Sequence, residues 1–555
     1  MKRWPIVSIL VVVGGAAAWI ALTPIPLLRE ELRVSEFWIL EALCLAVIAT
    51  TVAGLRQIAS AVNAGDRVLL AAVCALAFAL VLVAPRTNRI FYDEQIYQGI
   101  ARNLSDLHLA QMCNDGTVEY GHLQCWRNEY NKQPYGYPYF LSLGYRVAGV
   151  SEGVAHWLNV SLSAATACAL FLITLLLTGN RLSAGLAGLS FALIPEQLRW
   201  SHTAASEPSA AFVCTLAVLA AVVFVRSRTA TALVWVACAS SFAAYFRAEA
   251  VLVLPVIGVM ILVSARSELG RSRLWWVAAL GALLLVPEIA HLAAVRNEGW
   301  GTSDQRFSLA YLAHNLWTNG AFYFGDHRFP PIVTVLAFAG LAQLRATFAI
   351  ALWWLLFWSV FLFFYAGSYD YGADVRYSLL SYPPLAVLAG VGGSWIAAAA
   401  QRVFPSATWA NAAVAAVLLV QSTLYLPWVR AVGEEAWAAR ADVAFARIAA
   451  HELPANAIVL THNPSMFHVW GVSAAQLSIA AEEPDYVRSE LGRRYAGGVY
   501  LHWNFWCNTS DSEQVRFCEQ ARTNHPVELV REGRERDYRF ALYRLVPTTV
   551  QPSGF

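Results

Sequence analysis

The stretch Phe91-Tyr92-Asp93-Glu94-Gln95-Ile96-Tyr97 directly follows a hydrophobic span that ends near Ala84-Pro85. Acidic residues at a membrane boundary are costly to place, and they usually have a function. The acids open a segment in which apolar residues recur at helical spacing, namely Ile96, Tyr97, Ile100, Leu104 and Leu107. We expect an amphipathic helix that lies on the membrane surface and holds the acids over a lipid substrate. The alternative is a solvated helix start, where Asp and Glu suit the helix dipole.

The composition indicates a membrane protein. Of the 555 residues, 58% are hydrophobic and 14% are charged, and the mean hydropathy is +0.49. Soluble chains are closer to about one quarter charged. Apolar runs long enough to cross a bilayer recur along the chain. We expect a mostly α-helical, polytopic bundle of 11–13 transmembrane helices, with spans near 6–27, 37–55, 67–85, 153–178, 183–199, 208–225, 229–246, 248–264, 274–295, 331–344, 346–366, 378–400 and 407–428.

The orientation follows from the short loops that carry basic residues. These residues fall on one side of the spans together with Lys2 and Arg3, and basic loops mark the cytoplasmic side. They are Arg56, Arg67, Arg181, Arg226, Arg228, Arg266 to Arg273, Arg345 and Arg402. We therefore expect a multi-pass inner-membrane protein with segments 86–152, 296–330 and 429–555 outside the cytoplasm. The first span lacks a small-residue cleavage site, which favours a retained signal anchor over a cleaved signal peptide.

Four of the nine cysteines lie in the segments expected outside. They form two local pairs, Cys113 with Cys125 and Cys507 with Cys518. Because disulfides persist in oxidising compartments, we expect two disulfides, in agreement with the topology. The alternative for the first pair is a zinc site completed by His108 or His122, but neither segment has the tight C-x2-C spacing of structural zinc sites.

The sequence predicts three parts. Two extra spans occupy residues 1–60, and a membrane core with its long outer loop 86–152 occupies residues 61–428. After Pro427-Trp428 the composition becomes mixed, and residues 429–555 suffice for one small α/β domain outside the membrane. We expect a helix over 434–450 and strands at 457–460, 498–501 and 539–543.

Four groups of polar residues fall on the expected outer face. The first is Asp93-Glu94 and the second is Lys132-Gln133-Pro134, within an aromatic run that includes Tyr137. The third joins Arg199-Trp200-Ser201-His202 with Ser206-Glu207-Pro208, and the fourth joins Arg247 and Glu249 with Arg376-Tyr377. Each group has an ordinary explanation: a helix start, a snorkelling lysine, a capped helix, or an arginine with a structural carboxylate partner.

Together the four groups suit one reaction. A donor with an isoprenoid tail places its phosphate at the membrane interface, where Lys or Arg stabilises the charge that develops on the leaving phosphate. A carboxylate takes the proton of the acceptor hydroxyl. The sequence has no Gly-rich nucleotide-binding loop, and a polyprenyl-phosphate donor requires none.

The chain resembles the GT-C glycosyltransferases over roughly residues 67–400. It is most similar to the bacterial branch related to protein O-mannosyltransferases and to the 4-amino-arabinose lipid A transferase. The resemblance rests on Tyr92-Asp93-Glu94, Lys132-Gln133-Pro134, Ser206-Glu207-Pro208, Arg247-Ala248-Glu249 and Arg376-Tyr377, in this order. The family pattern is Lys-Pro-Pro where this chain has Lys-Gln-Pro.

The resemblance implies an inverting transfer of a sugar from a polyprenyl phosphate to a lipid, glycan or protein acceptor. Asp93 matches the catalytic base best and Glu94 is the second candidate, whereas Lys132 and Arg247 would hold the donor phosphate. The residues expected to contact the substrate are Tyr92, Lys132, Tyr137, His202, Glu207, Arg247, Glu249, Arg376 and Tyr377. Some relatives bind a divalent metal in the outer loop, but no ligand set in this sequence predicts a metal or a cofactor.

Three alternatives compete with this interpretation. A transporter could use interior charges such as Arg247, Glu249, Glu288 and His291, although no inverted repeat is visible. A non-catalytic scaffold would leave Asp93, Lys132 and Glu207 unexplained. Among enzymes, a glycan polymerase or ligase is the alternative. The net charge of +2 gives no indication of nucleic-acid binding.

Overall fold

The computed structural model describes residues 4–298, 305–370, 374–404 and 409–546. The chain divides into two compact units, each assembled from segments that are distant in sequence. The membrane unit comprises residues 1–87, 134–137 and 156–433, and the sheet unit comprises residues 88–133, 138–155 and 434–555. The sequence had assigned the loop 86–152 to the membrane core, but most of this loop belongs to the sheet unit.

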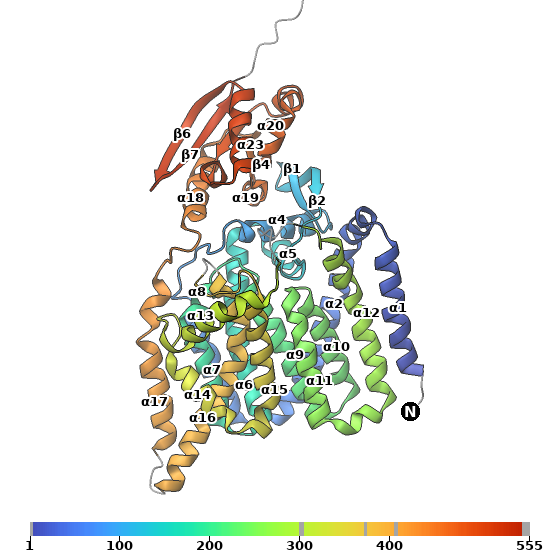
Figure 1. Ribbon diagram of the computed structural model, residues 1–555, viewed down its shortest axis with the longest axis vertical. Helices are drawn as coiled ribbons and strands as arrows, with labels where there is room; N and C mark the ends of the chain where they lie inside the picture. Colours follow the sequence, from blue (N-terminus) through green and yellow to red (C-terminus); the bar gives the residue numbers. More distant parts are fainter. Residues whose placement is uncertain (1–3, 299–304, 371–373, 405–408, 547–555) are drawn as a thin grey trace, which may run out of the picture. The chain divides into compact units, whose positions relative to one another are not determined.

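The membrane unit is helical. Its helices are α1 (Trp4–Leu22), α2 (Ile25–Ala61), α3 (Ala64–Val81), α6 (Glu152–Thr178), α7 (Arg181–Ala192), α8 (Pro195–Ser201), α9 (Glu207–Ser227), α10 (Ala230–Ala244), α11 (Val253–Ser264), α12 (Ser272–Ala294), α13 (Leu312–Gly325), α14 (Pro331–Leu341), α15 (Leu344–Ser359), α16 (Tyr382–Val403) and α17 (Ala410–Thr423). The long helices run roughly parallel to one another, whereas α8 and α13 lie across them (Figure 1). Among the described residues, seven helical segments are long and apolar enough to cross a membrane, and five further apolar helices are shorter. The predicted polytopic helical membrane fold is confirmed.

Two predicted spans differ in detail from the structure. The span expected at 183–199 is instead the short helix α7 followed by α8, because Pro195 cannot continue α7 and begins the next helix. The span expected at 37–55 is part of the 37-residue helix α2, which also contains Arg29-Glu30-Glu31. On α2, Arg33 pairs with Glu30, and Arg29 bonds to the carbonyl of Ala294 at the end of α12.

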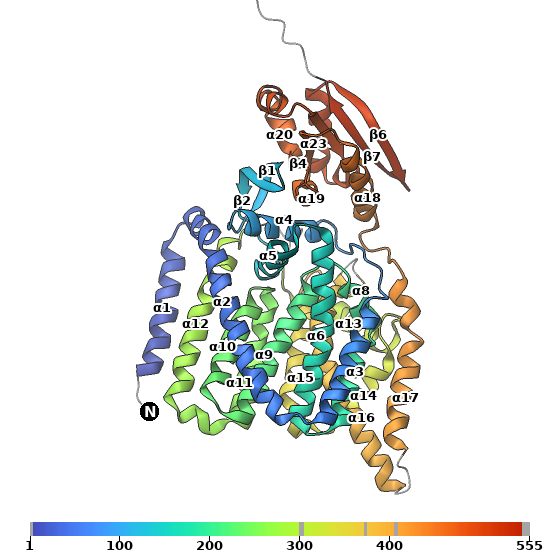
Figure 2. The ribbon, with the colours of Figure 1, turned by 180° about the vertical axis from the view of Figure 1, so that it is seen from behind.

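Glycines allow the central helix α16 to pack closely. A Cβ atom on Gly392 would lie 1.8 Å from the carbonyl oxygen of Leu336 on α14, and one on Gly390 would lie 2.3 Å from that of Ser183 on α7. Small residues therefore let these backbones approach each other, as is common between membrane helices. Seen from behind, α2 and α3 cover the other face of the membrane unit (Figure 2).

The sheet unit contains one seven-stranded sheet in the order β2-β1-β4-β3-β5-β7-β6. The strands are β1 (Met112–Glu119), β2 (His122–Glu129), β3 (Ala457–Thr461), β4 (Ser473–Gln476), β5 (Gly498–Trp503), β6 (Val527–Glu535) and β7 (Tyr538–Leu545). Strand β3 is parallel to β4 and to β5, and the remaining pairs are antiparallel. The helices include α4 (Asp93–Asp106), α5 (Gly136–Ala148), α18 (Trp437–Glu452), α19 (Pro464–Val469), α20 (Leu477–Glu482) and α23 (Ser512–Asn524).

Both faces of this sheet are covered by apolar side chains. Ile458 and Leu460 of β3 belong to one core cluster, with residues of α20 and α23, whereas Val459 belongs to the other, with residues of α18 and α19. Successive side chains of a strand point to opposite faces of the sheet, so a strand that is buried on both faces contributes to both clusters. The predicted helix and the three predicted strands of the C-terminal segment are present, as α18, β3, β5 and β7.

The hairpin of β1 and β2 extends the sheet of the C-terminal segment. Asp115 and Gly116 of β1 pair with Ala475 and Ala474 of β4. The pairing explains why the outer loop belongs to the sheet unit. Both predicted disulfides are present in this unit: Cys113–Cys125 joins the two strands of the hairpin, and Cys507–Cys518 joins the 3-10 helix Phe505–Asn508 to α23.

Candidate functional site

The membrane unit holds a compact cluster of two arginines and two glutamates. Arg247 donates from Nη1 to Glu207 and from Nε to Glu249, and Arg376 Nε lies 3.5 Å from Glu207 Oε1. Glu207 is fully buried, whereas the side chains of Arg247 and Arg376 are each 14% exposed. Glu207 of the third predicted group therefore meets Arg247 and Arg376 of the fourth, whereas the other residues of the third group make different contacts.

Local structure explains how this cluster forms. Glu207 is the first residue of α9, preceded by Ser206 and followed by Pro208, which suits the first helical turn. Arg247 has an extended backbone between α10 and the short 3-10 helix Ala248–Leu252. Arg376 lies in the 3-10 segment Asp374–Ser381, directly before α16. Three breaks between helices thus converge on the same point.

An aromatic ring completes the cluster. The ring of Tyr377 faces both guanidinium groups, with centroid distances of 5.5 Å to Arg247 and 5.3 Å to Arg376. Phe361 stacks on the ring of Tyr377 with centroids 4.4 Å apart. This arrangement limits the motion of the guanidinium groups, and arginines held this way favour recognition of phosphate or carboxylate oxygens.

Tyr137 and His202 belong to the same unit but make other contacts. Asn159 Nδ2 lies 3.5 Å from the Tyr137 hydroxyl, while Asn159 Oδ1 accepts from Ser209 in the first turn of α9. Tyr137 is therefore connected, through Asn159, to the helix start that carries Glu207. His202 instead bonds to the carbonyl of Ala84, so its contacts are with the end of the preceding span rather than with the arginines.

The sheet unit holds the first and second predicted groups. Asp93 opens α4 and is partly exposed, and Gln133 Nε2 donates to Asp93 Oδ1 at 3.4 Å. The hydroxyl of Tyr97, one turn along α4, donates to Gln133 Oε1 at 3.2 Å. Gln133 stands where the family pattern has proline, and it joins the Lys132 segment to Asp93 through its side-chain amide.

Glu94 has a different environment from Asp93. It is fully buried, and its Oε1 accepts the backbone N–H groups of Arg89 at 2.6 Å and of Ile90 at 3.2 Å. These bonds fix the chain that leads into α4. The geometry gives Glu94 a structural function and leaves Asp93 as the accessible carboxylate of the pair.

Tyr92 was expected to contact substrate, but the structure places its hydroxyl inside the sheet unit. The residue is buried, and its hydroxyl donates to Asp442 Oδ2 on α18. Burial, together with the charge of Asp442, raises the pKa of Tyr92 well above the ordinary tyrosine value. Helix α4 also buries the polar residues Gln98, Arg102 and Asn103. It is therefore covered by protein on more sides than the expected helix on the membrane surface would be.

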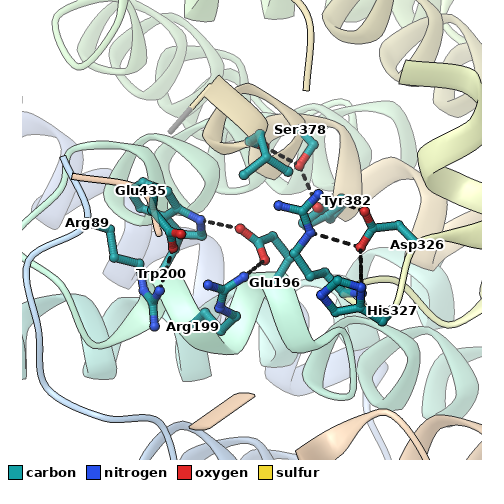
Figure 3. A network of polar contacts seen from close by, with 11 residues as sticks. Arg89, Glu196, Arg199, Trp200, Asp326, His327, Ser378, Tyr382 and Glu435 are labelled. Carbon is teal, nitrogen blue, oxygen red and sulfur yellow. Dashed lines mark hydrogen bonds and ion pairs between the residues drawn. The ribbon is translucent and has the colours of Figure 1, made fainter. Parts of the chain in front are cut away.

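A second buried polar network in the membrane unit was not predicted. Glu196 on α8 is fully buried and accepts from Arg199 Nη1 at 2.8 Å and from Trp200 Nε1 at 2.6 Å. Figure 3 shows Glu196 between Arg199, Trp200 and the neighbouring Asp326. Arg328 interacts electrostatically with Glu196 and forms two bonds to Asp326, at 2.8 and 2.7 Å. The sequence feature that could have revealed this network is a glutamate inside an apolar run, because a glutamate that is buried requires a partner.

The described residues contain one group of three possible metal ligands, His462, Cys507 and Cys518. Two of the three are the sulfurs of a disulfide, and a disulfide sulfur is not the thiolate that binds metals. The zinc alternative for Cys113 and Cys125 is likewise replaced by a disulfide.

Comparison with known proteins adds evidence on the fold. Residues 132–291 match the family model of dolichyl-phosphate-mannose-protein mannosyltransferases. This segment contains Lys132, His202, Glu207, Arg247 and Glu249. No curated protein sequence matches the chain significantly.

Solved structures match over most of the chain. The crystal structure of ArnT from Cupriavidus metallidurans bound to undecaprenyl phosphate has a TM-score of 0.51 and 15% identity, and the match covers 88% of this chain and 100% of that chain. Its apo state has a TM-score of 0.52 and 16% identity, covering 87% and 98%. The Archaeoglobus fulgidus oligosaccharyltransferase matches with a TM-score of 0.48 and 11% identity, covering 84% and 73%. The chain therefore has the GT-C fold of membrane glycosyltransferases, and its segment 132–291 carries the sequence pattern of the protein mannosyltransferases.

Proposed function

We propose that this protein is a membrane glycosyltransferase that transfers a sugar from a polyprenyl-phosphate donor to an acceptor hydroxyl on the outer face of the inner membrane. The observation that carries the proposal is the pair Arg247 and Arg376 around the buried Glu207, at the junction of three helices in a GT-C fold. Guanidinium groups bind phosphate oxygens in a planar, bidentate geometry. The similar ArnT structure from Cupriavidus metallidurans contains undecaprenyl phosphate.

An apolar cavity in the membrane unit supports a lipid-linked donor. It has a volume of about 140 Å³ and is lined by residues of α13, α14, α15 and α16, among them Tyr323, Trp354 and Trp358. Phe361, which stacks on Tyr377, follows Trp358 by less than one helical turn. The cavity has room for a short part of an isoprenoid tail, and it lies in the same unit as Arg247 and Arg376.

The reaction is a single displacement at the anomeric carbon. Asp93 takes the proton of the acceptor hydroxyl, and the acceptor oxygen forms a bond to the anomeric carbon. The bond between that carbon and the phosphate oxygen breaks, and its electrons remain on the polyprenyl phosphate, which Lys132, Arg247 and Arg376 stabilise. A single displacement of this kind inverts the configuration at the anomeric carbon. Asp93 is proposed as base because Glu94 is occupied by two backbone N–H groups.

One observation favours the transporter alternative. Glu288 lies in the apolar helix α12, and neither of its carboxylate oxygens has a hydrogen-bond partner among the described residues. It also experiences the charge of Glu36 on α2. Buried intramembrane acids mark ion pathways in many transporters.

The test is transfer from a panel of radiolabelled polyprenyl-phosphate sugars by the full-length protein in lipid nanodiscs. We expect one donor to be used by the wild type, and Asp93→Asn to abolish its use. Asp485→Asn, which removes a carboxylate whose side chain is 97% exposed in the sheet unit, is the matched control and is expected to retain activity. Failure of the wild type to transfer or bind any donor would contradict the proposal and favour the transporter.

A further inference from the structure

The start of helix α4, where Asp93 lies, is attached to the C-terminal segment of the sheet unit by polar contacts that are buried or partly buried. Arg89 is fully buried and pairs with Glu435 at 2.8 Å. Arg440 Nη1 reaches the carbonyl of Asn88 at 3.4 Å. Tyr92, the residue directly before Asp93, donates to Asp442. The residues that bind the start of α4 therefore come from positions 435–442, more than three hundred residues along the chain.

Asp442 is the centre of this attachment. It is fully buried on α18, with Oδ2 bonded to the Tyr92 hydroxyl and Oδ1 3.0 Å from His502 Nε2 on β5. His502 Nδ1 lies 3.1 Å from the Thr461 hydroxyl on β3. Tyr92, Asp442, His502 and Thr461 thus form one continuous chain of polar contacts from α4 to the central strands of the sheet.

Aromatic rings enclose the same segment. The ring of Phe505 lies 5.4 Å from Phe91 and 6.2 Å from Tyr92, and Trp506 lies 6.3 Å from Tyr92. The bond between Tyr92 and Asp442 is itself buried, and a hydrogen bond is stronger in such a low-dielectric environment than in water. Polar contacts and aromatic contacts therefore both hold the backbone immediately before Asp93.

We infer that Asp442 is a positioning residue for the catalytic base, acting through Tyr92 to hold Asp93 at the start of α4. This inference rests on the proposed function and deepens it, because it gives the C-terminal segment a part in the reaction. Asp442 itself touches no reacting atom. Rates fall steeply when a reacting group is displaced by as little as about 1 Å, so loss of this attachment is expected to lower the rate of transfer rather than the binding of donor.

The experiment compares Tyr92→Phe, Asp442→Asn and the double variant with the wild type in the transfer assay, using full-length protein. Tyr92→Phe removes one hydroxyl and keeps the ring. We expect about a tenfold loss in kcat for each single variant, with donor KM within about twofold, because the arginines proposed to bind phosphate are unchanged. The double variant is expected to lose no more than the larger single effect, because both changes break the same bond.

Tyr495→Phe is the matched control. Its hydroxyl is buried in the same unit and bonds to Thr117 at 2.5 Å, away from α4, so its removal costs similar stability without touching the attachment. We expect its kcat to stay within about twofold of the wild type. The thermal midpoint of each variant is measured in parallel.

The outcomes separate the two proposals. If Asp93→Asn abolishes transfer but Tyr92→Phe keeps wild-type kcat, the positioning inference is wrong and the proposed function stands. If Tyr92→Phe lowers kcat and Asp442→Asn does not, Tyr92 acts directly and Asp442 has no positioning function. If Tyr495→Phe lowers kcat as much as Tyr92→Phe does, the loss results from general destabilisation and the inference is wrong. If the wild type transfers no sugar from any donor, the proposed function fails and the inference fails with it.

Discussion

Arg247 and Glu207 are 40 residues apart in the sequence, and they form an ion pair in which the glutamate is fully buried at the first turn of α9. The same carboxylate oxygen lies near Arg376, so one acid balances part of the charge of two arginines. Removing one partner of a buried pair is far more costly than the net contribution of the pair suggests. The arrangement fixes the positions of the two guanidinium groups that we propose bind the donor phosphate.

A first prediction concerns the phosphate end of the donor. We expect undecaprenyl phosphate to raise the thermal midpoint of the wild type, and Arg247→Gln and Arg376→Gln to abolish this rise, because a ligand stabilises the folded state only at concentrations comparable to or above its Kd. Arg266→Gln, at an exposed position of the same unit, is the control and should keep the full shift. An unchanged shift in both cluster variants would show that the phosphate binds elsewhere.

The two adjacent acids are expected to behave differently. Glu94→Ala leaves the buried N–H groups of Arg89 and Ile90 without their acceptor, and we expect it to lower the free energy of unfolding by roughly 2 kcal/mol or more. Asp93→Ala is at a partly exposed position and should cost less than about 1 kcal/mol while abolishing transfer. Denaturant titration of the full-length variants, with the transfer assay alongside, measures both effects. Equal stability losses at the two positions would contradict the structural function of Glu94.

The buried His468 and the partly buried His462 predict a loss of stability in acid. Burial lowers the pKa of His462 to about 4 and, with the positive charge of Arg102, that of His468 to about 4. In the unfolded chain both groups have a pKa near 6.5, so the unfolded state takes up protons first as the pH falls. The stabilisation they provide is complete above pH 6.5 and is lost progressively between about pH 6.5 and pH 4, by up to about 1.4 kcal/mol per histidine per pH unit.

Thermal midpoints at pH 7 and pH 5 test this expectation. His468→Gln should reduce the difference between the two midpoints, because the substituted side chain takes up no proton in either state. His451→Gln, at an exposed position on α18, is the control and should leave the difference unchanged. A wild-type midpoint that rises between pH 7 and pH 5 would contradict the direction predicted from these histidines.

The packing of the membrane helices gives a further prediction. Gly392→Ala places a Cβ atom 1.8 Å from the carbonyl oxygen of Leu336, so α14 and α16 must move apart. We expect a loss of about 1–3 kcal/mol in stability, as for other overpacked interiors. Gly258→Ala on α11, where no atom lies within 4 Å of the new Cβ, should be neutral or slightly stabilising. Thermal unfolding of both variants in the same detergent measures the difference, and equal midpoints would exclude a close approach of α14 to α16.

Parts of this structure could be predicted because they depend on local patterns. Apolar runs identify the membrane helices, and the four cysteines outside those runs pair with their nearest sequence neighbours as disulfides. The helix α18 and the strands β3, β5 and β7 follow from periodicity. The polar residues around Arg247 could be singled out, since charges inside apolar runs require partners.

Other parts depend on contacts between distant segments, which no local pattern specifies. The pairing of β1 with β4 joins residues more than three hundred positions apart, and the sequence of the outer loop contains no sign of its partner strand. For the same reason the bond from Tyr92 to Asp442 and the contact of Asp442 with His502 were not predicted, nor was the network of Glu196.

The sequence by itself determined a polytopic helical membrane protein, two disulfides outside the spans, and a short list of polar residues suited to a phosphate-linked donor. Only the tertiary structure decided which of those residues act together. It separated Asp93 from Glu94, because Glu94 is fully buried and accepts two backbone N–H groups, whereas Asp93 is partly exposed. It also brought Glu207, Arg247 and Arg376 together, because three breaks between helices meet at the start of α9. The carboxylate of Glu207 is buried there, and a buried carboxylate requires a positively charged partner.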